Sequence, residues 1–418
     1  MSQQKSYALL SKRDELKAIA LFKQKTRLRT FLLVSIGTLS FLLGIGYSFI
    51  HRNPDALEYA DIEEYNEVEA SPNIPPSASK SGNVPAKTTI KIKAVGDIVP
   101  GTNYPNNRLH PQKKQLFQAV KPLLKGADFL FGNFESTLTN YPYSPKAGGG
   151  GLLVPFRTPP SYTQILKESG FDIMSVANNH SFDFYAQGFK DTIHNLENNG
   201  IKAVGKKGQI LIAHYQGLSI AWIGFSYLDD HNSINNLARA KALVKKASKR
   251  ADIVVISVHA GAEGTGAMRV RNQTEIFAGE NRGNLVKFTH AMIDNGADLI
   301  LGHSPHVPRA LELYKGKLIA YSLGNFMGYR TLATDAELAD SLVLEANLNN
   351  KGDFISGKII PVYLNRQGIP YPDRQGRSIK LIRQLTQLDF PKTPLNIQDN
   401  GQILRKEVRK DLAGKSGR

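Results

Sequence analysis

Five apolar segments rich in β-forming residues each end abruptly in Asp, Asn, Glu or His. They are residues 88–97, 127–135, 171–183, 251–263 and 297–306. Helical patterns separate them, at about 112–125, 160–169, 186–199, 235–250 and 284–295. Strands that alternate with helices are typical of an α/β fold with a largely buried sheet. We therefore predict an α/β protein whose sheet brings the five polar ends to one edge.

The polar residues at this edge form a ligand set for a metal. Ligand sites in open α/β folds lie beyond the carboxyl ends of the strands, so these side chains are expected around one cleft. A single His or Asn after a strand is more often a hydrogen-bonded or turn residue. Here, however, four of the ten histidines occupy strand ends, and carboxylates or amides accompany them. Imidazole, carboxylate and amide oxygen together suit Mn, Fe or Zn. The set comprises Asp97, Asn133, Glu135, Asn178, Asn179, His180, Asp183, His259, Glu263, His303 and His306.

The residue types limit which reactions the protein could catalyse. Because the chain has no cysteine, thiolate metal sites, disulfides and cysteine nucleophiles are excluded. No G-x-S-x-G motif is present, which disfavours a serine hydrolase of the triad type. A two-metal site with a neighbouring histidine as acid fits hydrolysis of a phosphoester or an amide.

Residues 31–50 form a run of twenty residues without a charge, long enough to cross a bilayer. Before it, residues 1–30 hold eight Lys or Arg and two acids; after it, residues 51–70 hold one Arg and seven acids. This asymmetry predicts a cytoplasmic amino terminus and an extracytoplasmic main domain. A buried core helix or a cleaved signal peptide fits the length and the flanks less well. We therefore expect a single-pass signal anchor that holds the main domain outside the membrane.

The remaining chain divides by composition. Residues 1–30 are a basic cytoplasmic tail, and residues 51–87 are an acidic and then Pro/Ser-rich stalk. A folded domain is expected over 88–395 and a basic tail over 396–418. The net charge is +17, and the outward part carries this excess because the charges of 1–30 and 51–70 cancel. An extracytoplasmic position argues against nucleic acid and for an anionic polymer or lipid surface as partner.

Several motifs resemble the capsule synthesis protein CapA, or poly-γ-glutamate biosynthesis, family of the calcineurin-like metallophosphoesterase superfamily. The resemblance covers roughly residues 89–395. It is carried by AVGDIVPG (94–101), FGNFESTLT (131–139), VANNHSFDFYAQG (176–188), VHAGAE (258–263) and GHSPHVPRALELYKGKLIAYSLGNF (302–326). It implies a four-layer α/β sandwich with a metal cleft at the strand ends. In the family's best-known setting, a membrane-anchored protein works with membrane-embedded subunits in making or exporting poly-γ-glutamate.

The resemblance also implies roles for individual residues. One or two ions of Mn, Fe or Zn would be held by Asp97, Glu135, Asn179, His259, His303 and His306. His180 would be the acid for the leaving group, and Asp183 would orient it. From motif alignment alone, Asn178 could replace Asn179. Candidate charges facing the polymer are Lys206, Lys207, Arg269, Arg271, Arg282 and Arg309.

Two departures from the superfamily pattern leave catalysis open. Val99 stands where a histidine ligand is usual, and Glu135 stands where an aspartate is usual. Three hypotheses remain. The first is an anchored accessory protein of polymer synthesis with a metal cleft, and the second is an active metal-dependent hydrolase of the envelope. The third is a binding module whose cleft has lost its metal, which the six remaining ligands disfavour.

Overall fold

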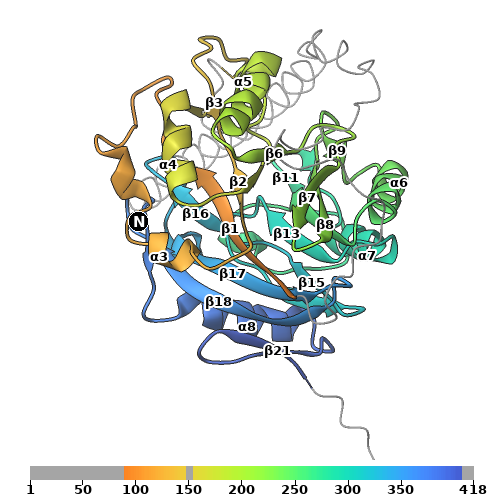
Figure 1. Cartoon of the computed structure of the whole chain (residues 1–418). Helices are drawn as coiled ribbons and strands as arrows, with labels where there is room; N and C mark the ends of the chain where they lie inside the picture. Colours follow the sequence, from red (N-terminus) through yellow and green to blue (C-terminus); the bar gives the residue numbers. More distant parts are fainter. Residues whose placement is uncertain (1–88, 147–153, 407–418) are drawn as a thin grey trace, which may run out of the picture. The chain divides into compact units, whose positions relative to one another are not determined.

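The computed structural model describes residues 89–146 and 154–406 of the 418-residue chain (Figure 1). The predicted anchor at 31–50, the basic segment before it and the stalk at 51–87 lie outside the described residues. Within the described ranges, no helix is long and apolar enough to span a bilayer.

The larger of two mixed sheets has ten strands and contains the first three predicted strand segments. Its parallel part is β1 (Thr89–Val99), β2 (Phe129–Phe134), β5 (Ile173–Ser175) and β6 (Lys202–Val204). Beyond β1 the sheet continues antiparallel through β17 (Asp340–Asn349), β18 (Phe354–Leu364), β21 (Gln402–Arg405) and β20 (Leu395–Ile397). β16 (Asn325–Gly328) pairs with β1, and β19 (Pro370–Pro372) pairs with β18. Strand pairing thus extends to residue 405, inside the range that the sequence analysis assigned to the basic tail.

The second sheet has seven strands and contains the other two predicted segments. Its parallel strands are β8 (Leu218–Ser226), β10 (Ile253–His259), β13 (Leu299–His303) and β15 (Lys317–Ala320). Antiparallel strands β7 (Leu211–Tyr215) and β14 (Leu311–Tyr314) form its edges, and β9 (Asn232–Ser233) pairs with β8. Two small ribbons lie outside the sheets, β3 (Thr137–Leu138) with β4 (Arg157–Thr158) and β11 (Ile276–Phe277) with β12 (Glu280–Asn281).

The five helices that the periodicity predicts all occur, the first two shorter than expected, and the described residues contain a further helix at Arg377–Asp389. The α-helices are α3 (Lys121–Leu124), α4 (Thr163–Glu168), α5 (Tyr185–Asn198), α6 (Leu237–Ser248), α7 (Leu285–Asp294) and α8 (Arg377–Asp389). The 3-10 helices are η1 (Lys113–Leu116), η2 (Pro160–Tyr162), η3 (Thr265–Ala267) and η4 (Ala336–Ala339). Pro122 lies in the first turn of α3 and interrupts the first predicted helix. In the second, the first turn is the 3-10 helix η2, which begins at Pro160, and α4 follows it.

The two sheets pack face to face and helices cover their outer faces. Between the sheets, Ile92 and Phe131 of the larger sheet share one apolar core with Trp222 and Leu301 of the smaller. A second core lies between the outer face of the larger sheet and the helices α3, α4 and α5. A third lies between the smaller sheet and the helices α6 and α7. The domain therefore has four layers, helix–sheet–sheet–helix (Figure 1).

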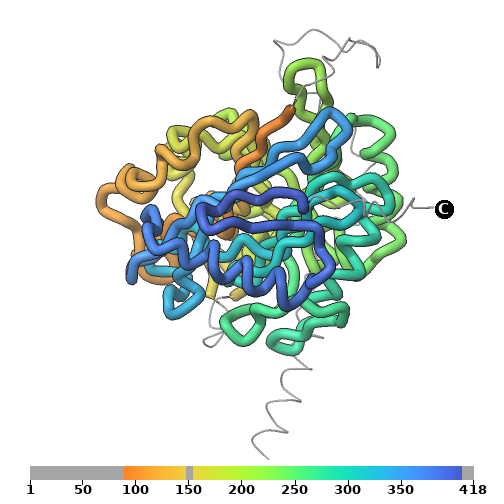
Figure 2. The backbone as a smooth tube through the Cα atoms, turned by 90° about the horizontal axis from the view of Figure 1, so that it is seen from below, coloured from red at the N-terminus to blue at the C-terminus, as the bar shows by residue number. Residues whose placement is uncertain are grey.

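Helix α8 contacts strands of both sheets. It packs against β17 and β18 of the larger sheet and against β14 of the smaller. In the view of Figure 2, α8 and the last strands lie together in blue across the face toward the viewer. Its buried residues Ile379 and Ile382 belong to the core between the sheets, whereas Leu385 belongs to the outer core of the smaller sheet. The C-terminal segment thus closes one side of the sandwich.

Trp222, the only tryptophan of the chain, provides a test of the core between the sheets. Its ring stacks on Phe131 with a centroid distance of 5.4 Å and is 1% exposed. We expect Trp222→Ala to lower the free energy of unfolding by about 3–5 kcal/mol, since it leaves a large cavity. Trp222→Phe should cost clearly less, because it keeps an aromatic ring and removes a buried Nε1–H that has no partner among the described residues. Urea unfolding followed by circular dichroism measures both, and equal losses would contradict this account.

Candidate metal centre

The carboxyl ends of strands from both sheets meet at one place. Within each sheet the register sets Asp97 beside Asn133 and His259 beside His303. Between the sheets, His303 Nδ1 lies 3.4 Å from Asp97 Oδ1, and His259 Nε2 lies 3.6 Å from Glu135 Oε1. Six of the eight predicted site residues share this set of close contacts: Asp97, Glu135, His180, His259, His303 and His306.

This convergence requires backbones that touch. A Cβ on Gly96 would lie 1.8 Å from the carbonyl oxygen of Gly324, and a Cβ on Gly302 would lie 2.2 Å from that of Tyr321. The backbone N–H of Asp97 donates to the same Gly324 oxygen at 2.9 Å. Both carbonyls belong to the segment 321–324, which runs from β15 of the smaller sheet to β16 of the larger. The glycines that precede Asp97 and His303 therefore let this connecting segment pack directly against β1 and β13 where the ligand residues begin.

Asp97 is fully buried and has several polar neighbours. Asn133 Nδ2 donates to Oδ1 at 2.8 Å, and the backbone N–H of Ser304 donates to Oδ2 at 3.3 Å. His306 Nδ1 lies 3.3 Å from Oδ2. Burial opposes ionisation, but the nearby imidazoles of His303 and His306 hold the pKa of Asp97 well below its usual value.

Glu135 is equally buried but has no hydrogen bond to either oxygen within the described part of the chain. Its Oε1 lies 3.6 Å from His259 Nε2, 3.8 Å from His306 Nε2 and 4.0 Å from His180 Nε2. Burial raises the pKa of Glu135 well above its usual value, and the charges of Asp97 and Glu263 add to this. An unpaired carboxylate is costly to bury, so Glu135 needs a cation or a proton.

The histidines offer nitrogens that the described residues leave unpaired. Both ring nitrogens of His303 and Nε2 of His259 are buried without a hydrogen-bond partner. Burial lowers the pKa of His259 well below its usual value, which keeps its imidazole neutral. His306 differs. Burial disfavours its charged form, but Glu135, Asp97 and Glu263 outweigh burial and raise its pKa to about 10.

The two adjacent asparagines have different surroundings. Asn178 Nδ2 donates to Phe134 O at 2.8 Å and to Asn133 Oδ1 at 3.2 Å, and its Oδ1 accepts from the N–H of His180. Asn179 Oδ1 is buried with no hydrogen-bond partner among the described residues. This geometry favours Asn179 as the amide ligand and gives Asn178 a role in holding the loop.

His180 and Asp183 form a hydrogen-bonded pair beside the cluster. His180 Nδ1 lies 2.7 Å from Asp183 Oδ2, and the His180 ring stacks on Phe156 with a centroid distance of 4.3 Å. Lys146 makes an ion pair with Asp183 Oδ1, and the N–H of Phe156 donates to Oδ2 at 2.6 Å. Burial opposes the charge on Asp183, but His180 and Lys146 lower its pKa below the usual value. Asp183 is thus fixed as a carboxylate that orients His180.

Two asparagines to which the resemblance assigned no role support the ligands; Asn133 was among the polar residues predicted at the strand ends, whereas Asn325 was not. Asn133 bridges Asp97 and His259, with Nδ2 at 2.8 Å from Asp97 Oδ1 and 3.2 Å from His259 Nδ1. Asn325 Oδ1 lies 2.9 Å from His306 Nδ1. Both lie inside motifs that carried the family resemblance, FGNFE and SLGNF, which was the available signal.

The donor set fits a divalent metal. Asp97, Glu135 and His306 each offer a ligand atom, and these atoms lie within 4.8 Å of one another. Unpaired atoms of Glu135, His259 and His303 surround them, as expected for ligands with an ion as their common partner. When bound, a metal at such oxygen and nitrogen ligands polarises a phosphoryl or acyl oxygen and activates water. His180 would then be placed to give or take a proton at Nε2.

Two of the cations expected to face a polymer are buried instead. Arg309 is fully buried and makes a bidentate ion pair with Glu275, at 2.9 Å to each oxygen. Arg282 is 4% exposed and pairs with Glu263 and Glu280. The prediction was wrong for these two residues, because each arginine compensates a neighbouring carboxylate inside the fold.

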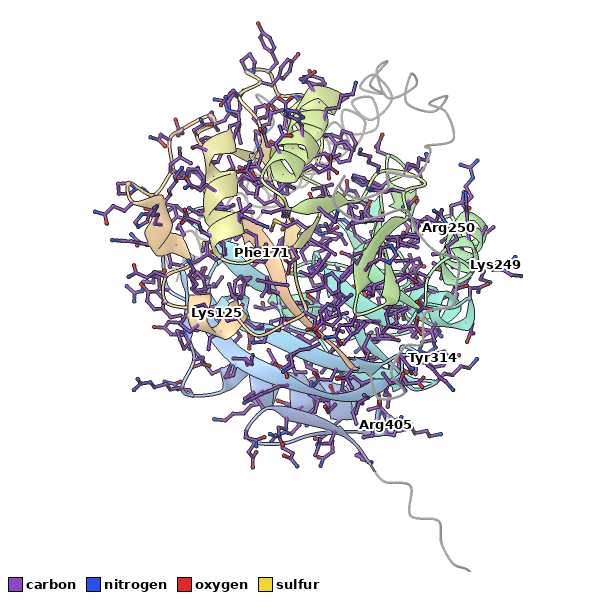
Figure 3. The ribbon with its side chains drawn as sticks, viewed as in Figure 1. Lys125, Phe171, Lys249, Arg250, Tyr314 and Arg405 are labelled. Atoms are coloured by element: carbon purple, nitrogen blue, oxygen red, sulfur yellow. The ribbon has the colours of Figure 1, made fainter. Side chains whose placement is uncertain are left out.

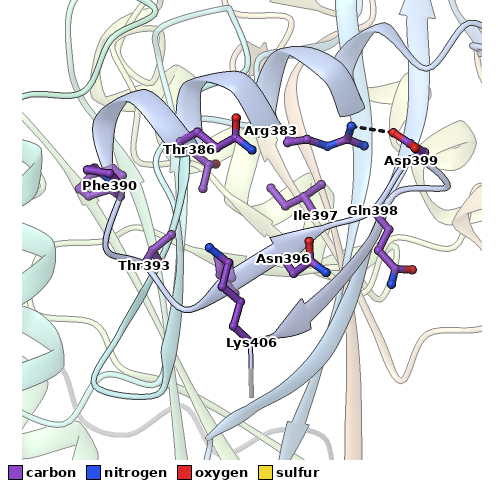
Figure 4. Close-up of a pocket in the computed structure, with 12 residues that line it drawn as sticks. Arg383, Thr386, Phe390, Thr393, Asn396, Ile397, Gln398, Asp399 and Lys406 are labelled. Carbon is purple, nitrogen blue, oxygen red and sulfur yellow. Dashed lines mark hydrogen bonds and ion pairs between the residues drawn. The ribbon is translucent and has the colours of Figure 1, made fainter. Parts of the chain in front are cut away.

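A cavity of about 390 Å³ lies elsewhere, between α8 and the hairpin of β20 and β21 (Figure 4). Arg383, Asn396, Gln398 and Lys406 are among its lining residues, and Arg383 pairs with Asp399 at 2.6 Å. None of the candidate metal ligands lines this cavity.

The model of the bacterial capsule synthesis protein family PGA_cap matches residues 91–329, a range that contains the whole cluster. The chain belongs to this family. It is 30% identical over 253 residues to the PGA biosynthesis protein CapA of Bacillus subtilis, which covers 56% of this chain and 62% of that protein. It is 27% identical over 308 residues to the capsule biosynthesis protein CapA of Bacillus anthracis, covering 68% and 69%.

The match to the B. subtilis relative thus spans less than two thirds of that protein. Among solved structures, a 5'-nucleotidase precursor from Thermus thermophilus is similar with a TM-score of 0.37 and 12% identity. That match covers 72% of this chain and 59% of the nucleotidase chain. A likeness at this level carries no inference about activity.

The charge on His306 gives the metal-free protein a defined pH dependence. Because its pKa rises to about 10 in the fold, from about 6.5 in an unfolded chain, protonated His306 stabilises the fold fully below about pH 6.5. That contribution is lost as the pH rises through 10. With a chelator present, the Tm of the wild type should fall more steeply between pH 7 and 10 than that of His306→Gln. Thermal unfolding at several pH values measures this, and parallel curves would contradict it.

Proposed function

We propose that this chain is a membrane-anchored extracytoplasmic protein of capsule or envelope polymer biosynthesis or export. The observation that carries the proposal is the family match over residues 91–329. The relatives support it, since the B. subtilis protein is named for PGA biosynthesis and the B. anthracis protein for capsule biosynthesis. We infer that the partner is an anionic polymer such as poly-γ-glutamate, handled together with membrane-embedded synthesis subunits.

The proposed topology places residues 1–30 in the cytoplasm, residues 31–50 across the membrane and the main domain outside. The uncharged run and the excess of Lys and Arg before it support this arrangement. The metallophosphoesterase-like domain over 88–395 would then stand on the stalk at 51–87 in the cell envelope. At such a position the domain meets a polymer as it leaves the membrane.

We further propose that the cleft holds one or two ions of Mn, Fe or Zn. The ligands would be Asp97, Glu135, Asn179, His259, His303 and His306. The close contacts among five of these residues and the unpaired buried atom of Asn179 support this set. A set of carboxylates, imidazoles and one amide oxygen, without any thiolate, suits such ions.

Helix α6 supplies the best surface for an anionic polymer. Its inner residues Ala240, Val244 and Ala247 are buried against the smaller sheet. Residues 237–250 contain no Asp or Glu. Figure 3 places Lys249 beside this helix at the rim of the domain. A row of cations on one helix face matches repeated carboxylates along a polymer, unlike scattered surface charges. The exposed cations are Arg239, Lys241, Lys245, Lys246 and Lys249.

An active hydrolase of phosphoesters or amides is the second candidate. The observation that favours it is the His180–Asp183 pair, because His180 Nε2 faces Glu135 at 4.0 Å and its Nδ1 is held by a carboxylate. This arrangement orients an imidazole for proton transfer at the cleft. A hydrolase would also act in the envelope, so the two proposals are compatible.

Metal content tests the cleft. We expect the purified full chain to hold one or two equivalents of Mn, Fe or Zn by elemental analysis, and His303→Ala with His306→Ala to lose them. The matched control replaces His194 and His214, which are exposed, by alanine and should keep the metal. A wild type without metal, even after each ion is added in excess, would refute the metal cleft and the hydrolase. Metal-loaded protein that cleaves phosphoesters or γ-glutamyl amides only while His180 is intact would support the hydrolase.

Polymer binding tests the role of α6. We expect Lys241→Gln, Lys245→Gln and Lys249→Gln together to weaken binding of the full chain to polyglutamate about tenfold at low salt. Three exposed ion pairs at about 0.5 kcal/mol each give this factor. The control carries the same charge change at Lys121, Lys125 and Lys358, which are exposed elsewhere. Light scattering or biolayer interferometry measures both, and equal losses would show that only the total charge matters.

A further inference from the structure

Glu263 is a third carboxylate at the metal cluster, and the metal ligands assigned above do not include it. Its Oε2 lies 3.8 Å from His306 Nε2, and Glu135 Oε1 lies at the same 3.8 Å from that nitrogen. His306 Nε2 is therefore equally distant from one oxygen of each of two carboxylates. Two ligands about 2.1 Å from a common ion in tetrahedral geometry lie about 3.4 Å apart, so this spacing matches neighbouring ligands.

The hydrogen bonding of His306 directs Nε2 toward this position. Its Nδ1 donates to Asn325 Oδ1 at 2.9 Å, which fixes the orientation of the ring. Histidines that bind metals commonly donate their other ring N–H to an oxygen acceptor in this way. His306 Nε2 is then the atom left to face a metal.

Glu263 is held in place by its own loop and by one buried arginine. Arg282 Nη1 pairs with Glu263 Oε1 at 2.8 Å and so leaves Oε2 to face His306. Arg282 is also fixed, since Glu280 pairs with its Nη2 at 2.9 Å and its guanidinium lies 4.2 Å from the centre of the Tyr227 ring. A carboxylate with one oxygen clamped and the other directed at the cluster is preorganised for an ion.

The loop that carries Glu263 is joined directly to the loop of His306. The N–H of Ala260 donates to His303 O at 3.1 Å, and the N–H of Gly264 donates to Pro305 O at 3.0 Å. Gly261 has φ 95°, and its N–H donates to Arg282 O at 2.9 Å. Backbone hydrogen bonds on both sides of Glu263 therefore set its distance from His306.

We propose that Glu263 is a further metal ligand and forms, with His306, a metal position of its own in the cleft. The inference rests on the proposed metal cleft and deepens it. Arg282 acts as a positioning residue, because it holds Glu263 without facing the ion. The position takes a divalent ion that prefers oxygen ligands with an imidazole, such as Mn²⁺.

Binding of Mn²⁺ to the chelator-treated full chain tests this, with free Mn²⁺ followed by electron paramagnetic resonance. The wild type should bind two equivalents. In Glu263→Gln one of them should be bound about 10- to 100-fold more weakly, whereas Glu280→Gln should match the wild type. Glu280 is a close control because it also pairs with Arg282 but has 47% of its side chain exposed and lies outside the contacts of His306. An equal Tm of all three proteins in chelator would exclude misfolding as the cause.

The outcomes separate this inference from the proposed function. A wild type that binds Mn²⁺ and a Glu263→Gln variant that binds the same number of ions equally tightly would overturn the role of Glu263 and leave the metal cleft intact. One ion in both proteins with unchanged affinity would do the same. A wild type that binds no Mn²⁺, Fe²⁺ or Zn²⁺ would overturn both.

Discussion

Two buried carboxylates in one water-excluded site determine how the rest of the centre must be arranged. Asp97 and Glu135 are both inaccessible to solvent, and the charge of Asp97 adds to the cost of ionising Glu135. In the metal-free chain, a protonated His306 meets part of this cost, which is why its pKa rises so far. A protonated imidazole between two carboxylates cannot also accept the lone pairs of the unpaired nitrogens of His303 and His259. A metal ion would satisfy both groups, since it supplies positive charge and accepts lone pairs.

The fold can offer such a site because the segment 321–324, which connects β15 of the smaller sheet to β16 of the larger, packs backbone to backbone against β1 and β13. Gly96 and Gly302 stand immediately before Asp97 and His303, and each faces a carbonyl oxygen at a distance that no Cβ tolerates. A larger residue at either position would displace this connecting segment from the strand that carries Asp97 or His303. The two glycines thus link the packing of the backbone to the positions of the ligand residues Asp97 and His303. The core around Trp222 holds the two sheets together farther along the same interface.

The sequence predicted what depends on local pattern and missed what depends on packing. The strand end at His303 and the helix at 186–199 followed from periodicity, and the structure has β13 ending at His303 and α5 at Tyr185–Asn198. The strand predicted to end at Asp97 continues to Val99. The supporting role of Asn325 depends on β16 pairing with β1, which links segments more than 200 residues apart. Arg309 was expected at the surface because a single arginine in a sequence does not reveal that Glu275 will be buried beside it. Contacts of that kind become visible only once the chain is folded.

The departures from the superfamily pattern, together with Glu263, favour oxygen ligands over nitrogen ligands. Val99 is fully buried and has no ligand atom in its side chain, so the centre lacks one imidazole that the resemblance would supply. Glu135 has a longer reach than an aspartate, and with Glu263 the centre gains a third carboxylate directed at His306. A set with fewer imidazoles and more carboxylates shifts preference from Zn²⁺ toward harder ions such as Mn²⁺. In the proposed centre, the negative charge that Glu263 adds is compensated by buried Arg282, which pairs with Glu263 at 2.8 Å.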